Sequence, residues 1–184
     1  MERIKLDQLA AKLREGNIIL ARLKTGWSIL IDALNEGAIS KAKSLHSLVD
    51  FGYRHVLFQT DAELNRLVDE IPAIGWDLLD SSNGEVILLL SSGRGVHDLM
   101  KKQDGALAVR KVDNREEQAL FRSAQTTLAA IPLKGKNHQF ETKVEEYSGV
   151  LKEVDYLLNL TPIQQVRHSI IRLDLNGEVK ILKS

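Results

Sequence analysis

The chain has no cysteine, little proline, few aromatic residues and no net charge. Its 184 residues include 0 cysteines and 3 prolines, and 5% of them are aromatic. Its 25 basic side chains balance 25 acidic ones. The absence of cysteine excludes disulfides, thiolate zinc sites, iron–sulfur clusters and cysteine nucleophiles. The balanced charge gives no bulk argument for a nucleic-acid partner, which would need a local basic patch.

Long apolar runs are missing as well. No run approaches the ~20 residues that span a bilayer, and the first residues, from Met1 to Asp7, contain no apolar core of a secretory signal. We therefore expect a cytoplasmic protein without a membrane partner. The composition, 43% hydrophobic and 27% charged, is typical of a globular domain. The length suits a single domain over residues 1–184.

Strand-like and helical patterns alternate along the chain, which predicts an α/β fold. Short apolar runs predict strands at 18–20, 27–31, 55–58, 86–90, 106–109, 127–131 and 156–160. Helical spacing predicts helices over 6–13, 35–48 and 141–151, with three more that begin after Thr60, Pro72 and Asp113. We predict one domain with a twisted, mixed parallel and antiparallel sheet and flanking helices.

Caps and turns mark several boundaries. Thr60 and Glu63 form a capping box at a helix start, and Asp113 with Glu116 is a second candidate. Asn176-Gly177 separates apolar runs at 169–173 and 179–182. This pair predicts a hairpin with a type I′ turn, in which both residues have positive φ.

Several fragments, in a fixed order, resemble the YrdC/Sua5 family, whose members make threonylcarbamoyl-adenylate for modification of adenosine-37 in tRNA. Residues 105–110, GALAVR, are similar to the family's GxxGIR, and 154–156, VDY, to its VDYI. Residues 168–171 and 176–181 are similar to its SSII segment and its C-terminal hairpin. The resemblance implies a YrdC-like fold with a concave face, and ATP with Mg²⁺ as cofactors. It also implies tRNA, double-stranded RNA or a nucleotide as a partner.

The first two polar motifs of that family are largely absent here. PTDTxYGL falls on residues 22–29, where Thr25 is the one polar residue kept and Trp27 replaces tyrosine. KxR falls on 46–48, where His46 and Leu48 replace the two cations. His46 has no second histidine at metal-ligand spacing, so we predict no metal site.

The remaining motifs are lost in the same way. The family's GPLT motif ends at Ile87, and its STSAN motif falls on the apolar residues 129–133. Of the family's paired serines, Ser169 remains, and Lys183 stands where the family has its final arginine. Adenylate synthesis needs cations on the triphosphate and fixed donors on carboxylate oxygens. Each lost group costs about 100-fold or more in rate. We therefore expect a pseudoenzyme, with Thr25, His46 and Ser169 as degenerate catalytic positions.

Five basic residues form our predicted nucleotide or anion site. Arg22 and Lys24 alternate on a strand, so both would face one side. The resemblance places Arg110 at the nucleotide phosphates, and Lys134 and Lys136 lie in a basic, glycine-containing loop. The alternatives are solubilising charges on an edge strand, an internal ion pair for Arg110 and a solvated loop. Trp27 would stack on a base or pack in the core.

Three functions stay open from the sequence. The first is a non-catalytic YrdC-like protein that binds RNA, a nucleotide or another anion in the concave cleft. The second is an ATP- or nucleotide-dependent enzyme of tRNA modification with altered chemistry, using His46 and Thr25. The third is a structural or regulatory partner protein, in which Leu48, Ile87, Ile131 and Leu133 are core or interface residues.

Overall fold

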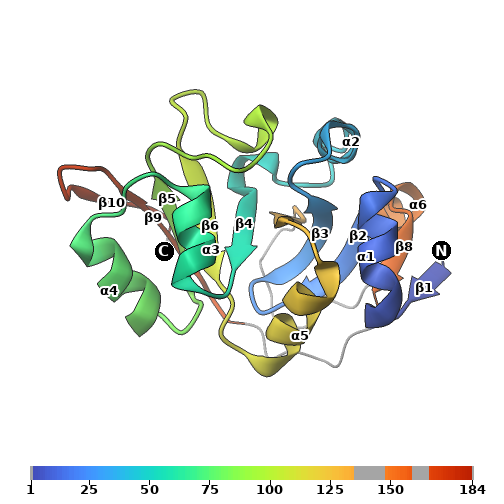
Figure 1. The fold of residues 1–184 in the computed structure, drawn as a ribbon. Coiled ribbons are helices and arrows are strands. Elements are labelled where there is room, and N and C mark those ends of the chain that lie inside the picture. The colour runs from blue at the N-terminus through green and yellow to red at the C-terminus, as the bar shows by residue number, and fades with distance from the viewer. Residues whose placement is uncertain (1, 135–147, 159–165, 184) are drawn as a thin grey trace.

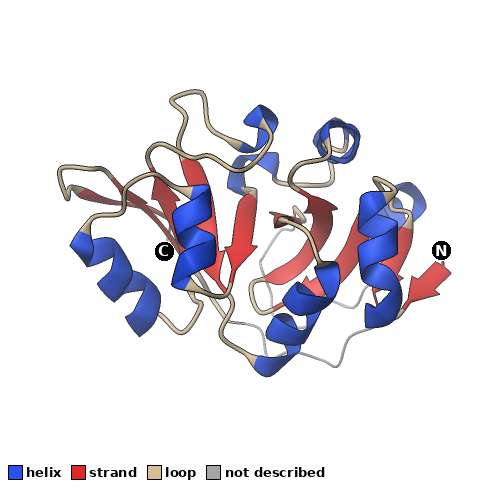
Figure 2. Ribbon diagram, in the orientation of Figure 1, coloured by secondary structure: helices blue, strands red, loops and turns tan. Residues whose placement is uncertain are grey.

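A ten-stranded sheet runs through the computed structural model, which describes residues 2–134, 148–158 and 166–183. The strand order is β1-β8-β2-β3-β7-β4-β6-β5-β9-β10. The pairs β1–β8, β2–β8, β4–β6 and β5–β9 are parallel, and the other neighbours are antiparallel. The predicted single α/β domain with a mixed sheet is confirmed (Figures 1 and 2).

The strands follow the apolar runs of the sequence closely. The apolar run at 86–90 forms β5. Five consecutive apolar residues suit a strand that is covered on both faces. The strands are β1 (Glu2–Ile4), β2 (Ile19–Leu23), β3 (Gly26–Asp32), β4 (His55–Phe58), β5 (Val86–Leu90), β6 (Leu107–Lys111), β7 (Leu128–Pro132), β8 (Tyr156–Leu158), β9 (Ser169–Leu173) and β10 (Val179–Lys183).

The helices flank this sheet. They are α1 (Leu6–Arg14), α2 (Glu36–Ser44), α3 (Asp61–Leu67), α4 (Ala73–Ser81), α5 (Arg115–Ala124) and α6 (Ser148–Glu153), with short 3₁₀ helices η1 (Phe51–Tyr53) and η2 (Asp98–Met100). The helix predicted over 35–48 ends at Ser44. Of the helix predicted over 141–151, residues 141–147 lie outside the described ranges. None of the helices in those ranges has the length and apolar content needed to cross a bilayer.

One predicted helix cap is correct and the other is wrong. Thr60 and Glu63 form the capping box: the Thr60 N–H donates to Glu63 Oε2 at 2.9 Å, and the Glu63 N–H donates to Thr60 Oγ1 at 3.3 Å. The box predicted at Asp113 and Glu116 is displaced by one residue. Asn114 is the N-cap of α5, and its Oδ1 accepts from the Glu117 N–H at 2.8 Å.

The closing hairpin forms, but with a different turn. Gly177 has φ +83, whereas Asn176 is not among the residues with positive φ. The Gly177 N–H donates to the Asp174 carbonyl at 2.9 Å, and the Asp174 N–H donates to the Glu178 carbonyl at 3.0 Å. The loop therefore runs over five residues between β9 and β10, and a loop of this length needs positive φ at Gly177 but not at Asn176.

Two apolar clusters hold the helices on the sheet. Helices α2, α3, α4 and α6 contribute to the largest cluster, where they meet strand residues such as Ile29 and Ile131. Helices α1 and α5 cover a second cluster, to which Leu30 and Leu57 belong. Neighbouring residues of β3 thus face different clusters, as the two-residue period of a strand requires.

Candidate polar site at the β2–β3 turn

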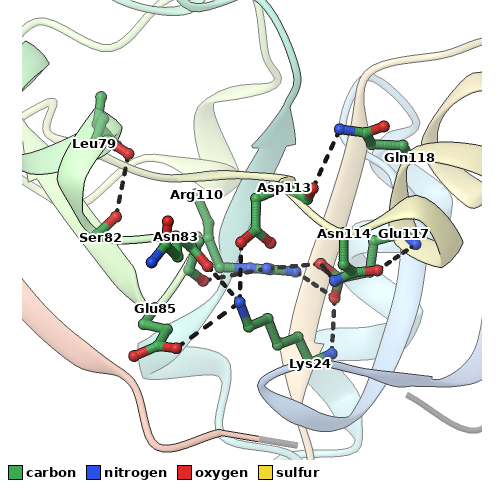
Figure 3. A network of polar contacts seen from close by, with 11 residues as sticks. Lys24, Leu79, Ser82, Asn83, Glu85, Arg110, Asp113, Asn114, Glu117 and Gln118 are labelled. Atoms are coloured by element: carbon green, nitrogen blue, oxygen red, sulfur yellow. Dashed lines mark hydrogen bonds and ion pairs between the residues drawn. The ribbon is translucent and has the colours of Figure 1, made fainter. Parts of the chain in front are cut away.

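A polar network surrounds Lys24, in the turn between β2 and β3 (Figure 3). Its Nζ lies 3.0 Å from Asp113 Oδ2, beyond the end of β6, and 3.9 Å from Glu85 Oε1, before β5. The same ammonium donates to the Asn83 carbonyl. The Lys24 side chain is 12% exposed. Two carboxylates of the protein therefore already surround this cation.

Arg110 lies at the centre of the network. Its Nη1 and Nη2 donate to Glu117 Oε2 and Oε1, each at 2.9 Å, and neither side chain is exposed. Arg110 comes from β6 and Glu117 from the first turn of α5. The Lys24 N–H also donates to Glu117 Oε1, at 2.7 Å, and Asn114 Nδ2 donates to Oε2 at 3.0 Å. Glu117 thus accepts four hydrogen bonds inside the protein (Figure 3).

These contacts decide the charge state of Glu117. Burial alone would raise the pKa of its carboxyl, because a charged group is poorly solvated there. The opposing charge of Arg110, its two hydrogen bonds and those from Lys24 and Asn114 outweigh burial, so the pKa lies below its usual value of 4.5. The pair is therefore ionised at neutral pH, and its two charges cancel locally.

The expectation that Arg110 grips an anion with Arg22 or Lys24 needs correction. Arg110 and Lys24 do meet, but around the carboxylate of Glu117 instead of a ligand. The alternative of an internal ion pair describes Arg110. Arg22 is half-buried on β2 and stands opposite Trp27 on β3. Trp27 packs against the largest apolar cluster, in line with the core alternative.

Thr25 directly follows Lys24 in the same turn, and the remaining predicted site residues belong to other segments. His46 is exposed, with Nδ1 3.1 Å from the Ser44 carbonyl, and the exposed Lys134 donates to the His46 carbonyl at 2.7 Å. Thr25 is 6% exposed, and its Oγ1 has no hydrogen-bond partner in the described ranges. Ser169 is half-buried, and its N–H donates to the Glu85 carbonyl at 3.0 Å. Lys136 lies outside the described residues.

The positions of KxR and STSAN are joined directly through the backbone. The Lys134 N–H donates to the Leu48 carbonyl at 2.9 Å, and the Asp50 N–H donates to the Pro132 carbonyl at 2.8 Å. Ile131 is 0% exposed and Leu133 4%. Ile87, where GPLT would end, is 1% exposed. Apolar side chains at these motif positions therefore belong to the packed interior.

Two buried histidines near Arg110 escaped the sequence analysis. His55 on β4 is fully buried, and its Nδ1 donates to the Tyr53 carbonyl at 3.1 Å. Burial, followed by the charges of Arg110 and His168, lowers the pKa of His55 to about 3. His168 is 7% exposed. The sequence signal for the burial of His55 was its position in the run HVLF, because the other residues of that run are apolar core residues.

The residues at this site do not fit ATP with Mg²⁺. Glu85, Asp113 and Glu117 surround the cations that a triphosphate would need, and three carboxylates repel phosphate oxygens. Across the described ranges, no group of three or more metal-ligating side chains is placed to hold a metal ion. Magnesium bound through substrate phosphates needs carboxylates that are free to face it, and these carboxylates already bind lysine or arginine.

Comparison with models of protein families assigns the chain to one family. The Sua5/YciO/YrdC family model, described as telomere recombination, matches residues 11–184. The chain belongs to the Sua5/YciO/YrdC family. A search of curated protein sequences found no match.

Solved structures show the same fold. The chain is similar to P. abyssi Sua5 complexed with L-threonine, with a TM-score of 0.77 at 16% identity, over 98% of this chain and 56% of that one. E. coli YciO gives a TM-score of 0.77 at 16% identity, over 100% and 94% of the two chains. HypF in its phosphate- and nucleotide-bound form gives 0.70 at 18%, over 96% and 28%. The chain thus spans little more than half of the Sua5 protein.

Proposed function

We propose that this protein is a non-catalytic member of its family, related to tRNA-modification enzymes, that acts by binding instead of by making threonylcarbamoyl-adenylate. The buried pair of Arg110 and Glu117 carries this proposal, because it neutralises the cation that the family resemblance assigns to the nucleotide phosphates. Relatives of this fold have been seen with L-threonine, or with phosphate and nucleotide. In this chain, the positions that the family resemblance assigns to polar motifs include the internally paired Arg110 and the buried apolar residues Ile87 and Ile131.

Electrostatics supports the loss of synthesis. A triphosphate entering the network would meet Glu85 and Asp113 as well as Lys24. Releasing Arg110 for a ligand would leave Glu117 as a buried, unpaired charge, and breaking a buried pair in this way costs about 3–5 kcal/mol. Binding energy spent on that rearrangement is lost to the transition state.

The test is a synthase assay. Purified protein is incubated with threonine, bicarbonate, ATP and Mg²⁺, and threonine-dependent pyrophosphate release is followed beside an active family member. We expect no release above the enzyme-free background, from a sample whose cooperative thermal unfolding shows that it is folded. Turnover at about 1 per second or faster, as in ordinary enzymes, would overturn the proposal.

A basic cluster around η1 favours RNA as the bound partner. Arg54 donates to the carbonyls of Phe51, Met100 and Lys101, and Lys102 donates to that of Gly52. Lys183 lies 5.1 Å above the Tyr53 ring. Burial lowers the pKa of all three cations, and the charge of Arg54 adds to this at Lys102. The carboxylate of Asp50 offsets part of this lowering of the pKa at Lys102 and Lys183, and a bound phosphate would offset more of it.

Titration with a short double-stranded RNA tests this second candidate. We expect binding that weakens as salt rises, with a slope that counts the phosphates neutralised. Lys102→Ala should weaken binding and reduce that slope by about 1. Lys152→Ala, which removes an exposed lysine on α6, serves as the matched control and should bind like wild type. Equal titrations for wild type and Lys102→Ala would exclude the cluster as the RNA site.

A further inference from the structure

The outer edge of the sheet at β10 exposes large apolar side chains. Val179 is 42% exposed, Ile181 66% and Leu182 44%, and Leu175 in the preceding loop is 46% exposed. β10 is the last strand of the sheet, next to β9. β1 lies at the opposite edge (Figure 1). There the exposed residues are the charged Glu2 and Arg3 instead. β10 also carries Lys180 and Lys183, but its exposed apolar side chains make this edge a template for pairing with another strand.

The backbone of β10 is oriented for such pairing. The Glu178 carbonyl accepts from the Asp174 N–H, so it faces β9. Because N–H and C=O groups alternate along an antiparallel strand, those of Val179 and Ile181 face outward. The same two residues stand opposite Leu173 and Ile171 of β9, which fixes their side chains on one face. Val179 and Ile181, together with the exposed Leu175 of the preceding loop, form what we name the edge patch.

We propose that the edge patch binds a second copy of this chain, with the two β10 strands antiparallel and a two-fold axis at Val179. Val179 then meets its own counterpart. Glu178 stands opposite Lys180 of the second copy, and this ion pair occurs twice. Ile181 stands opposite Gly177 of the second copy, where the space that a Cβ would occupy has no atom within 4 Å. The patch is thus complementary to itself in charge and in shape.

Other registers are less favourable. An axis at Lys180 would place that lysine opposite its own copy. An axis at Ile181, with the bulge beyond it counted, would place Lys180 opposite Lys183. Like charges directly opposite each other destabilise a strand pair. Of these three registers, the one centred on Val179 brings opposite charges together. Because this charge complementarity arises between two identical strands, we take a second copy of the chain as the partner that occupies the edge patch.

The contact is small, so we expect a reversible dimer. Residues 177–181 of each chain face one another across the axis, and of these 179–181 belong to β10. Interfaces of this size lie at the low end of specific association, which suggests a dissociation constant on the order of 100 μM.

Sedimentation velocity tests the proposal. The protein concentration is varied from about 10 μM to about 1 mM, which is roughly a tenth to ten times that dissociation constant. Wild type should pass from monomer to dimer across this range. Ile181→Lys should weaken association by about 10-fold or more. Leu34→Lys, which replaces a residue 55% exposed outside the patch, should dimerise like wild type. Circular dichroism should show all variants folded.

A charge exchange makes the test specific for the register. Glu178→Lys should weaken the dimer, and adding Lys180→Glu should restore it, because the double variant places the opposite charges in exchanged positions. A wild type that stays monomeric throughout the range, open polymers in place of dimers, equal effects of Ile181→Lys and Leu34→Lys, or no recovery in the double variant would each overturn the proposal.

Discussion

Arg110 and Glu117 face each other across the junction of β6 and α5, joined by two N–H···O bonds of 2.9 Å that are closed to solvent. The residues are seven positions apart, and the loop between them brings the strand end and the helix start together. An arginine at a position that resembles a phosphate ligand thereby becomes part of the interior.

Removing Glu117 should be strongly destabilising. Glu117→Gln leaves the guanidinium of Arg110 buried without a counter-charge, and we expect a loss of about 3–5 kcal/mol in the free energy of unfolding, measured by urea denaturation. The double variant Arg110→Met, Glu117→Leu should recover much of that loss, because it removes both buried charges. If the double variant lost as much stability as Arg110→Met and Glu117→Leu lose separately when added together, the residues would not act as a pair.

Acid should destabilise the protein over two overlapping pH ranges, and His55 is responsible for the higher one. Its pKa of about 3 in the folded protein lies below its ordinary value of 6.5, so the unfolded chain binds more protons between these values. This contribution to stability is complete above pH 6.5 and falls by up to about 1.4 kcal/mol per pH unit below it.

Replacing His55 should therefore flatten the upper part of the pH profile. His55→Leu should show a smaller decrease in the free energy of unfolding between about pH 6.5 and 5, measured by urea titration at each pH. The exposed His46→Leu variant controls for the loss of a histidine as such. Glu117 acts lower: its pKa lies below 4.5 when folded, so its contribution is present above 4.5 and is lost as the pH falls through the folded value.

Reintroducing a family hydroxyl should damage the core instead of restoring a site. Ile131→Ser places a hydroxyl where the side chain is 0% exposed and removes buried methyl groups. We expect a loss of about 3–5 kcal/mol from the cavity and the desolvated hydroxyl. Thermal denaturation measures it, and Ile131→Val, with an expected loss of about 1 kcal/mol, is the control. A stability equal to wild type would mean that this position is not packed.

The side chain of Lys24 should contribute much less than that of Arg110 to the free energy of unfolding. Its ammonium bridges carboxylates that are themselves 27% and 47% exposed, and pairs open to water contribute about 1 kcal/mol or less. The bond from the Lys24 N–H to Glu117 involves the backbone and survives substitution. We expect Lys24→Met to lose about 1 kcal/mol or less by urea denaturation. A loss as large as that of Glu117→Gln would show that the side chain belongs to the buried pair.

The sequence was sufficient for much of the fold, because its signals are local. The Thr60–Glu63 box and the apolar run of β5 act through neighbouring residues. The start of α5 was misplaced by one residue, because Asn114 caps the helix while Glu117 is held by Arg110. The turn at Asn176-Gly177 was mistyped, because the Gly177 N–H bonds back to the Asp174 carbonyl and Gly177 takes a positive φ while Asn176 does not.

The candidate site was less accessible from sequence. The pattern LAVR at 107–110 shows an arginine at the end of a strand, but not whether it meets a ligand or a carboxylate. The answer depends on Glu117, which arrives through a separate helix. His55 illustrates the same difficulty, since its burial depends on the strands and loops of the folded chain that pack around it.

The pairing of β1 with β8 has a consequence for the order of folding. Glu2 stands beside Tyr156, so β1 can pair only after a strand that is synthesised much later in the chain. The neighbouring strand β2 also pairs with β8 on that side. Contacts between such distant residues must overcome a long loop closure and slow folding. During synthesis, the part of the sheet around β1 and β2 therefore stays incomplete until β8 has emerged.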